Sequence, residues 1–364
     1  MAAPAPRPGI LDIEAYVGGR SSVPGAPGGR MIKLASNESP LGPSPRAVAA
    51  YHAAAADLNR YPDGGATGLR TALAVLHGID AGRIVCGGGI DELLALLARA
   101  YAGPGDEVLH SEYGFLMYAI AARAVGAEPV ATPEPELRAD IAALVARASA
   151  KTRIVFLANP NNPTGSYLSG GELRRLREGL PEAALLVIDA AYAEYVGEAD
   201  YSAGKELVDA FDNVVMTRTF SKIFGLAALR LGWAYCPAAI ADVLNRVRGP
   251  FNITGPALAA GQAALADGEH IAKARRHNDR FRPWLADALS RLGLEVNPGV
   301  GNFVLVRFPS ESGRDADAAC AFLMERGIIP RSMHEYRLPD CLRITIGLED
   351  ELEALVAALA EFMG

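Results

Sequence analysis

The chain has 364 residues, 50% of them hydrophobic, and a formal net charge of −7 at pH 7. This length is enough for a large core, in two domains or in one domain with an additional lobe. The acidic balance argues against non-specific binding to nucleic acid.

Four scattered cysteines, none of them in a CxxC pair, argue against a disulfide framework and against a zinc site. Residues 1–30 lack the continuous apolar segment of a signal peptide, and the alanine-rich runs are too short to span a membrane. We therefore expect a soluble cytoplasmic enzyme or binding protein that contacts neither membrane nor nucleic acid.

The first elements are an arm and two helices. Residues 1–30 are rich in Pro, Gly and Ala and predict an arm, with Tyr16 as its anchor. A Pro-Ser-Pro sequence then predicts the capped start of a helix over 46–58. Thr67 is expected to cap the next helix, over 68–77.

A glycine loop follows the first strand, which we expect over 83–86. The loop leads through Ile90 and Asp91 into a helix over 93–100. This order places backbone N–H groups around a phosphate. The dinucleotide motif GxGxxG is absent because Glu92 stands where its last glycine would be. From this stretch alone, an ordinary tight turn between strand and helix is an equally good interpretation.

Short apolar strands alternate with helices from about residue 65 to 250, which predicts a mainly parallel sheet with helices on both faces. The remaining strands are expected over 106–110, 128–131, 152–158, 184–189, 213–217 and 231–236. The helices between them are expected over 113–125, 137–150 and 171–179. Ligands of such sheets bind beyond the carboxyl ends of the strands. Asn162, in a rigid turn with two X-Pro steps, and Asp189, with Tyr192 beyond it, follow two of these strand ends.

Lys222 follows the strand over 213–217. It is flanked by Thr219 and Ser221 on one side and by a small, apolar run that leads to Arg230 on the other. Desolvation disfavours an ammonium, so a lysine in this setting is able to lose its proton and form a Schiff base with a carbonyl. A lysine at a helix start, with its charged end in water, is an equally good interpretation of this stretch alone.

The C-terminal part predicts a small α+β domain. A long helix over 256–291 links it to the rest, and Arg343 lies within one of its strands. A buried arginine there needs an anion, although an arginine on an exposed edge strand is the commoner case. We expect three parts: an arm with a small-domain segment over 1–45, a large domain over 46–255, and the linking helix with the small domain over 256–364.

Together, these groups meet the needs of pyridoxal phosphate. That cofactor needs a lysine for its aldehyde, a carboxylate for its pyridine nitrogen, hydrogen bonds to its phenolic oxygen and an anion cradle for its phosphate. The sequence indeed resembles the fold-type-I, aspartate-aminotransferase-like enzymes that use this cofactor. Within them it resembles the histidinol-phosphate aminotransferases. The segments that carry the resemblance cover nearly the whole chain: KLASNESPLGPSP (33–45), RYPDG (60–64), GGGIDE (87–92), YGFLMY (113–118), NPNNPTG (159–165), DAAY (189–192), TFSKIFGLAALRLGW (219–233), GNFVLVRF (301–308), GIIPR (327–331) and CLRITIG (341–347).

The resemblance implies that Lys222 binds the cofactor aldehyde and shuttles the proton, and that Asp189 pairs with the pyridinium N–H. Asn162 and Tyr192 would bond to the phenolic oxygen. The implied catalytic residues are Lys222, Asp189 and Tyr192. The remaining implied cofactor contacts are Tyr113 stacked on the ring, Ile90, Asp91, Thr219, Ser221 and Arg230 at the phosphate, and Tyr61 reaching that phosphate from the other subunit of a homodimer. No metal is implied.

Arg343 would bind the acidic tail of the substrate, and Arg331, Tyr16 and Asn37 would complete that pocket. Two departures from the family pattern stand out. Ile90 replaces a common Ser or Ala, which is tolerable if only its backbone is used. Arg337 replaces a usual glycine, and an added cation beside the two pocket arginines would shift the preference among anions.

The expected reaction moves an amino group from L-histidinol phosphate to 2-oxoglutarate by ping-pong exchange, as a step of histidine biosynthesis. An aromatic-amino-acid or prephenate aminotransferase is the alternative on the same scaffold. Other classes are a decarboxylase with the same cofactor, a nicotinamide dehydrogenase, against which the absent GxGxxG argues, and a non-catalytic regulator, which no DNA-binding segment supports.

Overall fold

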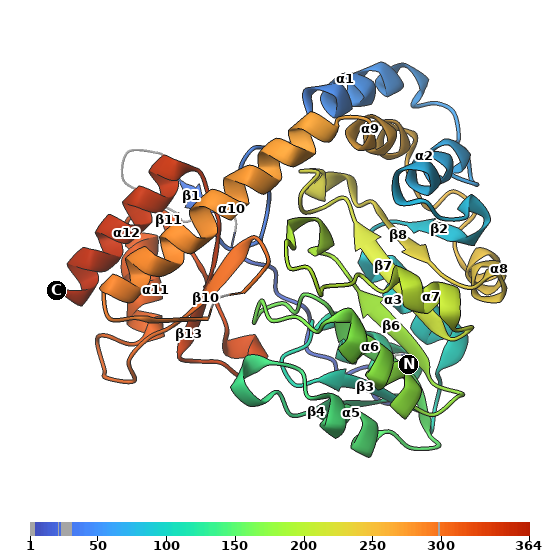
Figure 1. The fold of residues 1–364 in the computed structure, drawn as a ribbon, viewed down its shortest axis with the longest axis horizontal. Helices are drawn as coiled ribbons and strands as arrows, with labels where there is room; N and C mark the ends of the chain where they lie inside the picture. Colours follow the sequence, from blue (N-terminus) through green and yellow to red (C-terminus); the bar gives the residue numbers. More distant parts are fainter. Residues whose placement is uncertain (1–3, 21, 23–30, 298) are drawn as a thin grey trace.

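The computed structural model describes residues 4–20, 22, 31–297 and 299–364. Parts of the predicted arm, at positions 1–3, 21 and 23–30, lie outside the described residues. Figure 1 shows a large lobe around one sheet and a smaller lobe around another, with the long helix α10 (Gly268–Arg291) running between them.

The sheet of the large lobe has seven strands in the described part of the chain, in the order β2-β8-β7-β6-β5-β3-β4. Neighbouring strands from β7 to β4 are parallel, and β8 is antiparallel to both of its neighbours. The expectation of a mainly parallel sheet is therefore confirmed. The strands are β2 (Ile84–Gly87), β3 (Glu107–Ser111), β4 (Glu128–Thr132), β5 (Thr152–Ala158), β6 (Leu185–Asp189), β7 (Val214–Thr219) and β8 (Gly232–Tyr235).

Both faces of this sheet are covered, and β5 shows why its sequence is almost continuously apolar. Val155 and Leu157 join the hydrophobic core on one face, whereas Ile154 and Phe156 join the core on the other. Successive side chains of a strand point to opposite faces, so both sets must be apolar when both faces are buried. The helices that cover the faces and edges are α1 (Pro45–Ala54), α2 (Thr67–His77), α3 (Ile90–Tyr101), α4 (Met117–Val125), α5 (Ile141–Arg147), α6 (Gly170–Gly179), α7 (Lys205–Ala210), α8 (Ala238–Val247) and α9 (Gly255–Leu265).

The small lobe has a four-stranded antiparallel sheet in the order β12-β13-β10-β9. Its strands are β9 (Glu295–Asn297), β10 (Phe303–Arg307), β12 (Arg331–Ser332) and β13 (Cys341–Thr345). Helices α10, α11 (Ala316–Glu325) and α12 (Glu349–Met363) pack on it around one core. The N-terminal segment joins this lobe, because β1 (Ile32–Lys33) pairs in parallel with β11 (Ile328–Ile329).

Several expectations about helix boundaries are wrong, and in three cases a carboxylate accepts backbone N–H groups at the start of the helix. In a fourth case, α4 begins at Met117 and not at Tyr113. Thr67 does not cap α2; it is the first helical residue, and Asp63 accepts its N–H at 2.6 Å. Helix α5 begins only at Ile141, where Asp140 accepts two backbone N–H groups. The helix expected over 256–291 is two helices, because Asp267 caps a new start after α9 has ended.

Helix α9 also differs from the expectation in where it packs. Its Ala257 and Leu258 belong to the core of the large lobe, together with residues of α2. The helix that links the two lobes is therefore α10 and not α9 (Figure 1). None of the described helices is long and apolar enough to cross a membrane.

Candidate active site

A cavity of about 300 Å³ lies beyond the carboxyl ends of β5, β6 and β7, and residues of both lobes and of the arm line it. The sheet topology explains this location, because the carboxyl ends of parallel strands meet at one edge. The predicted site residues that line it are Tyr16, Ile90, Asp91, Asn162, Asp189, Tyr192, Thr219, Ser221, Lys222, Arg230, Arg331 and Arg343.

Lys222 lies in the bend that follows β7 and not at the start of a helix. Its Nζ donates a hydrogen bond to the Ser36 carbonyl at 3.3 Å. The same nitrogen lies 5.5 Å from the centre of the Tyr192 ring. The lysine thus reaches into the cavity, between the arm segment and the end of β6. This position makes its amine available to a bound molecule.

Asp189 is the last residue of β6 and is only 5% exposed. Its Oδ2 accepts a hydrogen bond from Tyr118 Oη at 2.9 Å, whereas its buried Oδ1 has no partner among the described residues. Burial raises the pKa of Asp189 to about 6, and the Tyr118 bond opposes that rise. Asp189 lines the cavity, and its Oδ1, without a partner among the described residues, fits the N–H donor of a ring.

Asn37 lies behind Tyr192 and not on the cavity wall. Its Nδ2 donates to Tyr192 Oη at 2.9 Å, and its backbone N–H donates to Thr345 Oγ1 at 2.9 Å. Phe303 packs against the Tyr192 ring edge-on, with the ring centres 5.3 Å apart. Asn37 thus orients the Tyr192 hydroxyl. Because Asn37 does not line the cavity, the described geometry does not support its predicted direct contact with the substrate.

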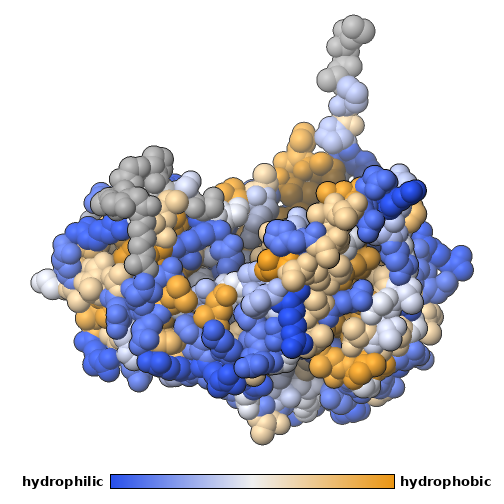
Figure 2. Space-filling view, turned by 90° about the horizontal axis from the view of Figure 1, so that it is seen from above, coloured by the Kyte–Doolittle hydropathy of each residue, from blue (hydrophilic) through white to orange (hydrophobic). Residues whose placement is uncertain are grey.

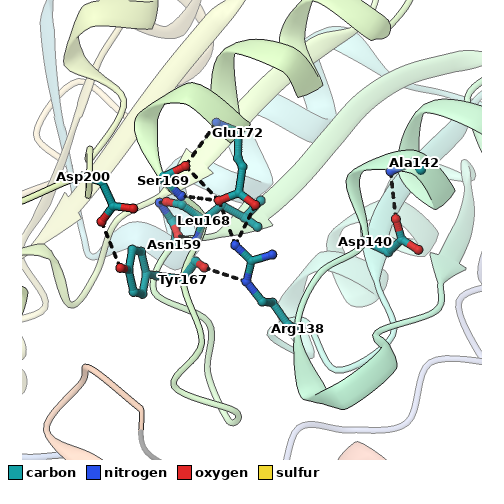
Figure 3. A network of polar contacts seen from close by, with 9 residues as sticks. All are labelled: Arg138, Asp140, Ala142, Asn159, Tyr167, Leu168, Ser169, Glu172 and Asp200. Atoms are coloured by element: carbon teal, nitrogen blue, oxygen red, sulfur yellow. Dashed lines mark hydrogen bonds and ion pairs between the residues drawn. The ribbon is translucent and has the colours of Figure 1, made fainter. Parts of the chain in front are cut away.

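The turn that carries Asn162 is anchored from outside the cavity. Asn159 exchanges hydrogen bonds with the backbone of Leu168, at 2.8 and 3.0 Å (Figure 3). Ser169 and Glu172 form a capping box at the start of α6. Arg138 pairs with Glu172 at 2.7 Å and braces the same segment (Figure 3). These contacts leave the Asn162 side chain free to face the cavity.

An anion cradle lies at the start of α3. Gly89 has φ of +95°, a backbone conformation that strains any residue with a Cβ, and a Cβ there would also displace the end of the Arg230 side chain. Arg230 donates to Ser221 Oγ at 3.2 Å and pairs with Asp91 at 2.9 Å. The helix N-terminus, a hydroxyl and a guanidinium therefore converge as a phosphate requires.

Two arginines of the small lobe close the other side of the cavity. Arg343 on β13 is 6% exposed; it donates to Asn162 Oδ1 and, at 2.8 Å, to the Ala35 carbonyl. No carboxylate of the described chain pairs with Arg343, and burial lowers its pKa. Arg331 donates to the Val17 carbonyl at 2.8 Å and to Glu335 at 2.5 Å. A buried guanidinium without a counter-ion favours a bound anion.

Tyr113, Tyr61 and Arg337 do not line this cavity, and Tyr61 is expected to reach the cavity of the other subunit. Tyr113 precedes α4 and packs on a cluster that includes Leu305, and Phe115 lines the cavity instead. Tyr61 is 82% exposed and stacks on Phe251, with ring centres 4.6 Å apart. Arg337 is exposed and does not line the cavity, so the described geometry gives it no part in anion preference.

Sequence reasoning missed Phe115, Ser36 and Tyr118. Phe115 and Tyr118 lie in a run of aromatics that is typical of a core, and Tyr118 does stack on Phe156 at 5.0 Å. Ser36 contributes only its backbone carbonyl, for which a sequence carries no signal.

Comparisons with known proteins agree with this geometry. The family model "Aminotransferase class I and II" matches residues 29–359. The histidinol-phosphate aminotransferase of Paramagnetospirillum magneticum is 59% identical over 364 residues, which is 100% of both chains. That of Rhodospirillum rubrum is 57% identical over 360 residues, covering 99% of this chain and 97% of the relative.

Solved structures of aminotransferases also superpose on this chain. The histidinol-phosphate aminotransferase of Sinorhizobium meliloti in complex with pyridoxal-5'-phosphate superposes with a TM-score of 0.89 at 30% identity, covering 100% of this chain and 98% of that one. An aspartate aminotransferase of Thermus thermophilus, at 22% identity, has a TM-score of 0.81 and covers 91% of each chain, which supports the fold alone.

Proposed function

This chain belongs to the class I and II aminotransferases, and on that basis we propose that it transfers an amino group between L-histidinol phosphate and 2-oxoglutarate with pyridoxal phosphate as its cofactor. The observation that carries the proposal is a single cavity that holds the Lys222 amine, the free oxygen of Asp189 and two buried arginines. The names of relatives more than 50% identical over the whole chain support the substrate.

The residues of the cavity fit the proposed cofactor. The unpaired Asp189 Oδ1 is an acceptor for the pyridine N–H, and the cradle of Gly89, Ser221 and Arg230 suits its phosphate. When bound, pyridoxal phosphate supplies an aldehyde for the substrate amine and a ring that takes up electron density from the substrate Cα. Tyr192, held by Asn37, offers its hydroxyl to the phenolic oxygen, together with Asn162.

We assign the proton transfer to Lys222. Its amine reaches into the cavity from the bend after β7, where the Ser36 carbonyl and the Tyr192 ring hold it. There it acts as the base that takes the proton from the substrate Cα and later returns it.

We assign substrate binding to Arg343 and Arg331, with Tyr16 of the arm over them. A guanidinium binds phosphate and carboxylate equally well through paired N–H donors. The same pair therefore serves the phosphate ester of one substrate and the distal carboxylate of the other, as a ping-pong exchange requires.

We also propose a homodimer in which Tyr61 reaches the phosphate cradle of the partner. Tyr61 and Phe251 form an exposed aromatic stack, and the exposed apolar residues Val48, Tyr51 and Leu58 lie on or near α1. Figure 2, seen from the side that carries α1, shows hydrophobic patches between hydrophilic ones. A second copy covers such a surface and completes the site.

The predicted division into parts 1–45, 46–255 and 256–364 remains a proposal. Because α9 packs in the large lobe, we place the second boundary at Ala266, between α9 and α10. The four cysteines are all free, and we propose the cytoplasm as the location.

A turnover assay tests the proposed function. The purified protein, loaded with pyridoxal phosphate, is given L-histidinol phosphate and 2-oxoglutarate, and the glutamate formed is measured. L-Phenylalanine replaces histidinol phosphate in a parallel sample. Faster formation of glutamate from phenylalanine would move the assignment to the aromatic branch, and release of carbon dioxide would point to a decarboxylase.

A further inference from the structure

Glu134 is a buried carboxylate behind the cavity wall that the proposed mechanism does not use. It follows β4 and is 4% exposed. Its Oε1 accepts the backbone N–H of Tyr113 at 3.2 Å, and its two oxygens lie 3.4 and 3.2 Å from Asn161 Nδ2. The Ser111 side chain also bonds to it. Among the described residues no arginine or lysine pairs with Glu134.

These contacts hold the two segments that form one wall of the cavity. Asn161 directly precedes Asn162, which lines the cavity and accepts a hydrogen bond from Arg343. Tyr113 lies two residues before Phe115, which also lines the cavity. Glu134 does not line the cavity, yet it connects both segments from behind.

We propose that Glu134 is a positioning residue, whose carboxylate fixes the turn that carries Asn162 and thereby holds Arg343 in the orientation that binds the anionic end of the substrate. The inference deepens the proposed function, because it concerns the same anion pocket. It depends on the aminotransferase family and not on histidinol phosphate as the substrate.

Glu134 must be ionised to hold the turn that carries Asn162. All three partners donate to it, so protonation places a donor where an acceptor is needed. The titratable groups that face it are Glu112 and the Tyr113 phenol. Burial raises the pKa of Glu134 to about 7, Glu112 raises it further, and the hydrogen bonds from Ser111, Tyr113 and Asn161 oppose the rise. Affinity for anionic substrates therefore falls as Glu134 takes up its proton near neutrality.

The test compares the loaded native protein with Glu134→Gln and with Glu136→Gln as matched control. Glu136 lies two residues on and is exposed, so its replacement removes the same charge without touching the wall. The readout is the apparent dissociation constant of L-glutamate, from the change in the visible absorbance of the bound cofactor, between about pH 6 and pH 8.5. Glu134→Gln is expected to weaken glutamate binding about fivefold at the alkaline end. It should also lose the part of the pH dependence centred near pH 7, whereas Glu136→Gln behaves as the native protein does.

A merely structural role is separated by a second variant and a second measurement. Ser111→Ala removes one donor and leaves the carboxylate, so the midpoint of the pH dependence should move upward. Urea unfolding at the alkaline end should find Glu134→Gln no less stable than the native protein, because a buried charge has been removed. A native pH profile and native glutamate affinity in Glu134→Gln, or an unmoved midpoint in Ser111→Ala, would overturn the inference. If the protein binds glutamate as expected but does not react with histidinol phosphate, the proposed substrate is wrong and the role of Glu134 is unaffected.

Discussion

Tyr118 Oη donates a hydrogen bond to Asp189 Oδ2 at 2.9 Å, whereas the buried Asp189 Oδ1 has no hydrogen-bond partner within the described part of the chain. Tyr118 is fully buried and stacks on Phe156, so its hydroxyl has little freedom to turn elsewhere. The bond lowers the pKa of Asp189 against the opposing effect of burial. Tyr118 thus keeps the carboxylate both oriented and easier to ionise.

Replacing Tyr118 with Phe should weaken cofactor binding. The variant loses one hydrogen bond to a charged group, and the pKa of Asp189 rises further. The dissociation constant of pyridoxal phosphate for the cofactor-free protein should increase about tenfold. Fluorescence titration measures it. Tyr235→Phe is the matched control, because Tyr235 makes the same kind of bond to Asp209 at 2.6 Å away from the cavity. Equal affinities in both variants would contradict the role of Tyr118.

Asp189→Asn should stabilise the cofactor-free protein while it impairs cofactor binding. The pKa of Asp189 is raised from 3.8 to about 6, so the folded protein binds a proton in this range that the unfolded chain releases. Stability therefore falls as the pH rises from about 3.8 to about 6 and stays lower above that range. At neutral pH the gain in the free energy of unfolding is at most about 3 kcal/mol. Urea unfolding at several pH values measures it, and a variant less stable than the native protein at neutral pH would contradict the raised pKa.

Arg343→Lys should impair substrate binding more than chemistry. Lysine keeps the charge, but it cannot supply paired donors to an anion and also bond to Asn162 and the Ala35 carbonyl. The KM values for glutamate and histidinol phosphate should rise by about ten- to a hundredfold, with a smaller change in kcat. Steady-state kinetics provide the measurement. Arg280→Lys, at an exposed ion pair with Glu349, should leave both KM values unchanged. An equal rise in KM in both variants would contradict the substrate-binding role of Arg343.

Arg337→Gly should raise stability and leave substrate preference unchanged. Arg337 has φ of +59°, a conformation that costs a residue with a Cβ about 1 kcal/mol. Its side chain is exposed and lies off the cavity. The free energy of unfolding should increase by roughly 0.5 kcal/mol after the entropy of glycine is counted. By contrast, Arg175→Gly inside α6 should lose about 1 kcal/mol. A changed ratio of KM values for histidinol phosphate and glutamate would restore Arg337 as a determinant of anion preference.

The sequence predicts the central strands well because local pattern and tertiary burial agree there. Strand β5 has the predicted bounds, Thr152 and Ala158, and its apolar run from Ile154 onward is buried on both faces. Helix starts are less predictable, since they depend on which carboxylate turns back onto the backbone. Asp140 and Asp267 do so, and the first moves the start of α5 while the second splits a long helical pattern.

Most of the candidate site follows from residue types at strand ends, because parallel strands bring those ends together. Lys222 and Asp189 share one cavity for this reason, whereas Arg343 reaches the cavity from the antiparallel sheet of the small lobe. What the sequence does not predict is orientation within an aromatic run, such as Phe115 in the wall with Tyr113 behind it. It also gives no sign of Glu134, whose partners are a backbone N–H and two polar side chains from other segments.

A visible absorbance titration tests the central claim most directly. L-Histidinol phosphate, L-glutamate and L-phenylalanine are added to separate samples of the loaded protein, with Lys222→Ala as the control that should not complete the exchange. We expect histidinol phosphate to convert the bound cofactor to its amine form at far lower concentration than phenylalanine does. Conversion by phenylalanine without conversion by histidinol phosphate would contradict the substrate, and full exchange by Lys222→Ala would contradict the role of the lysine.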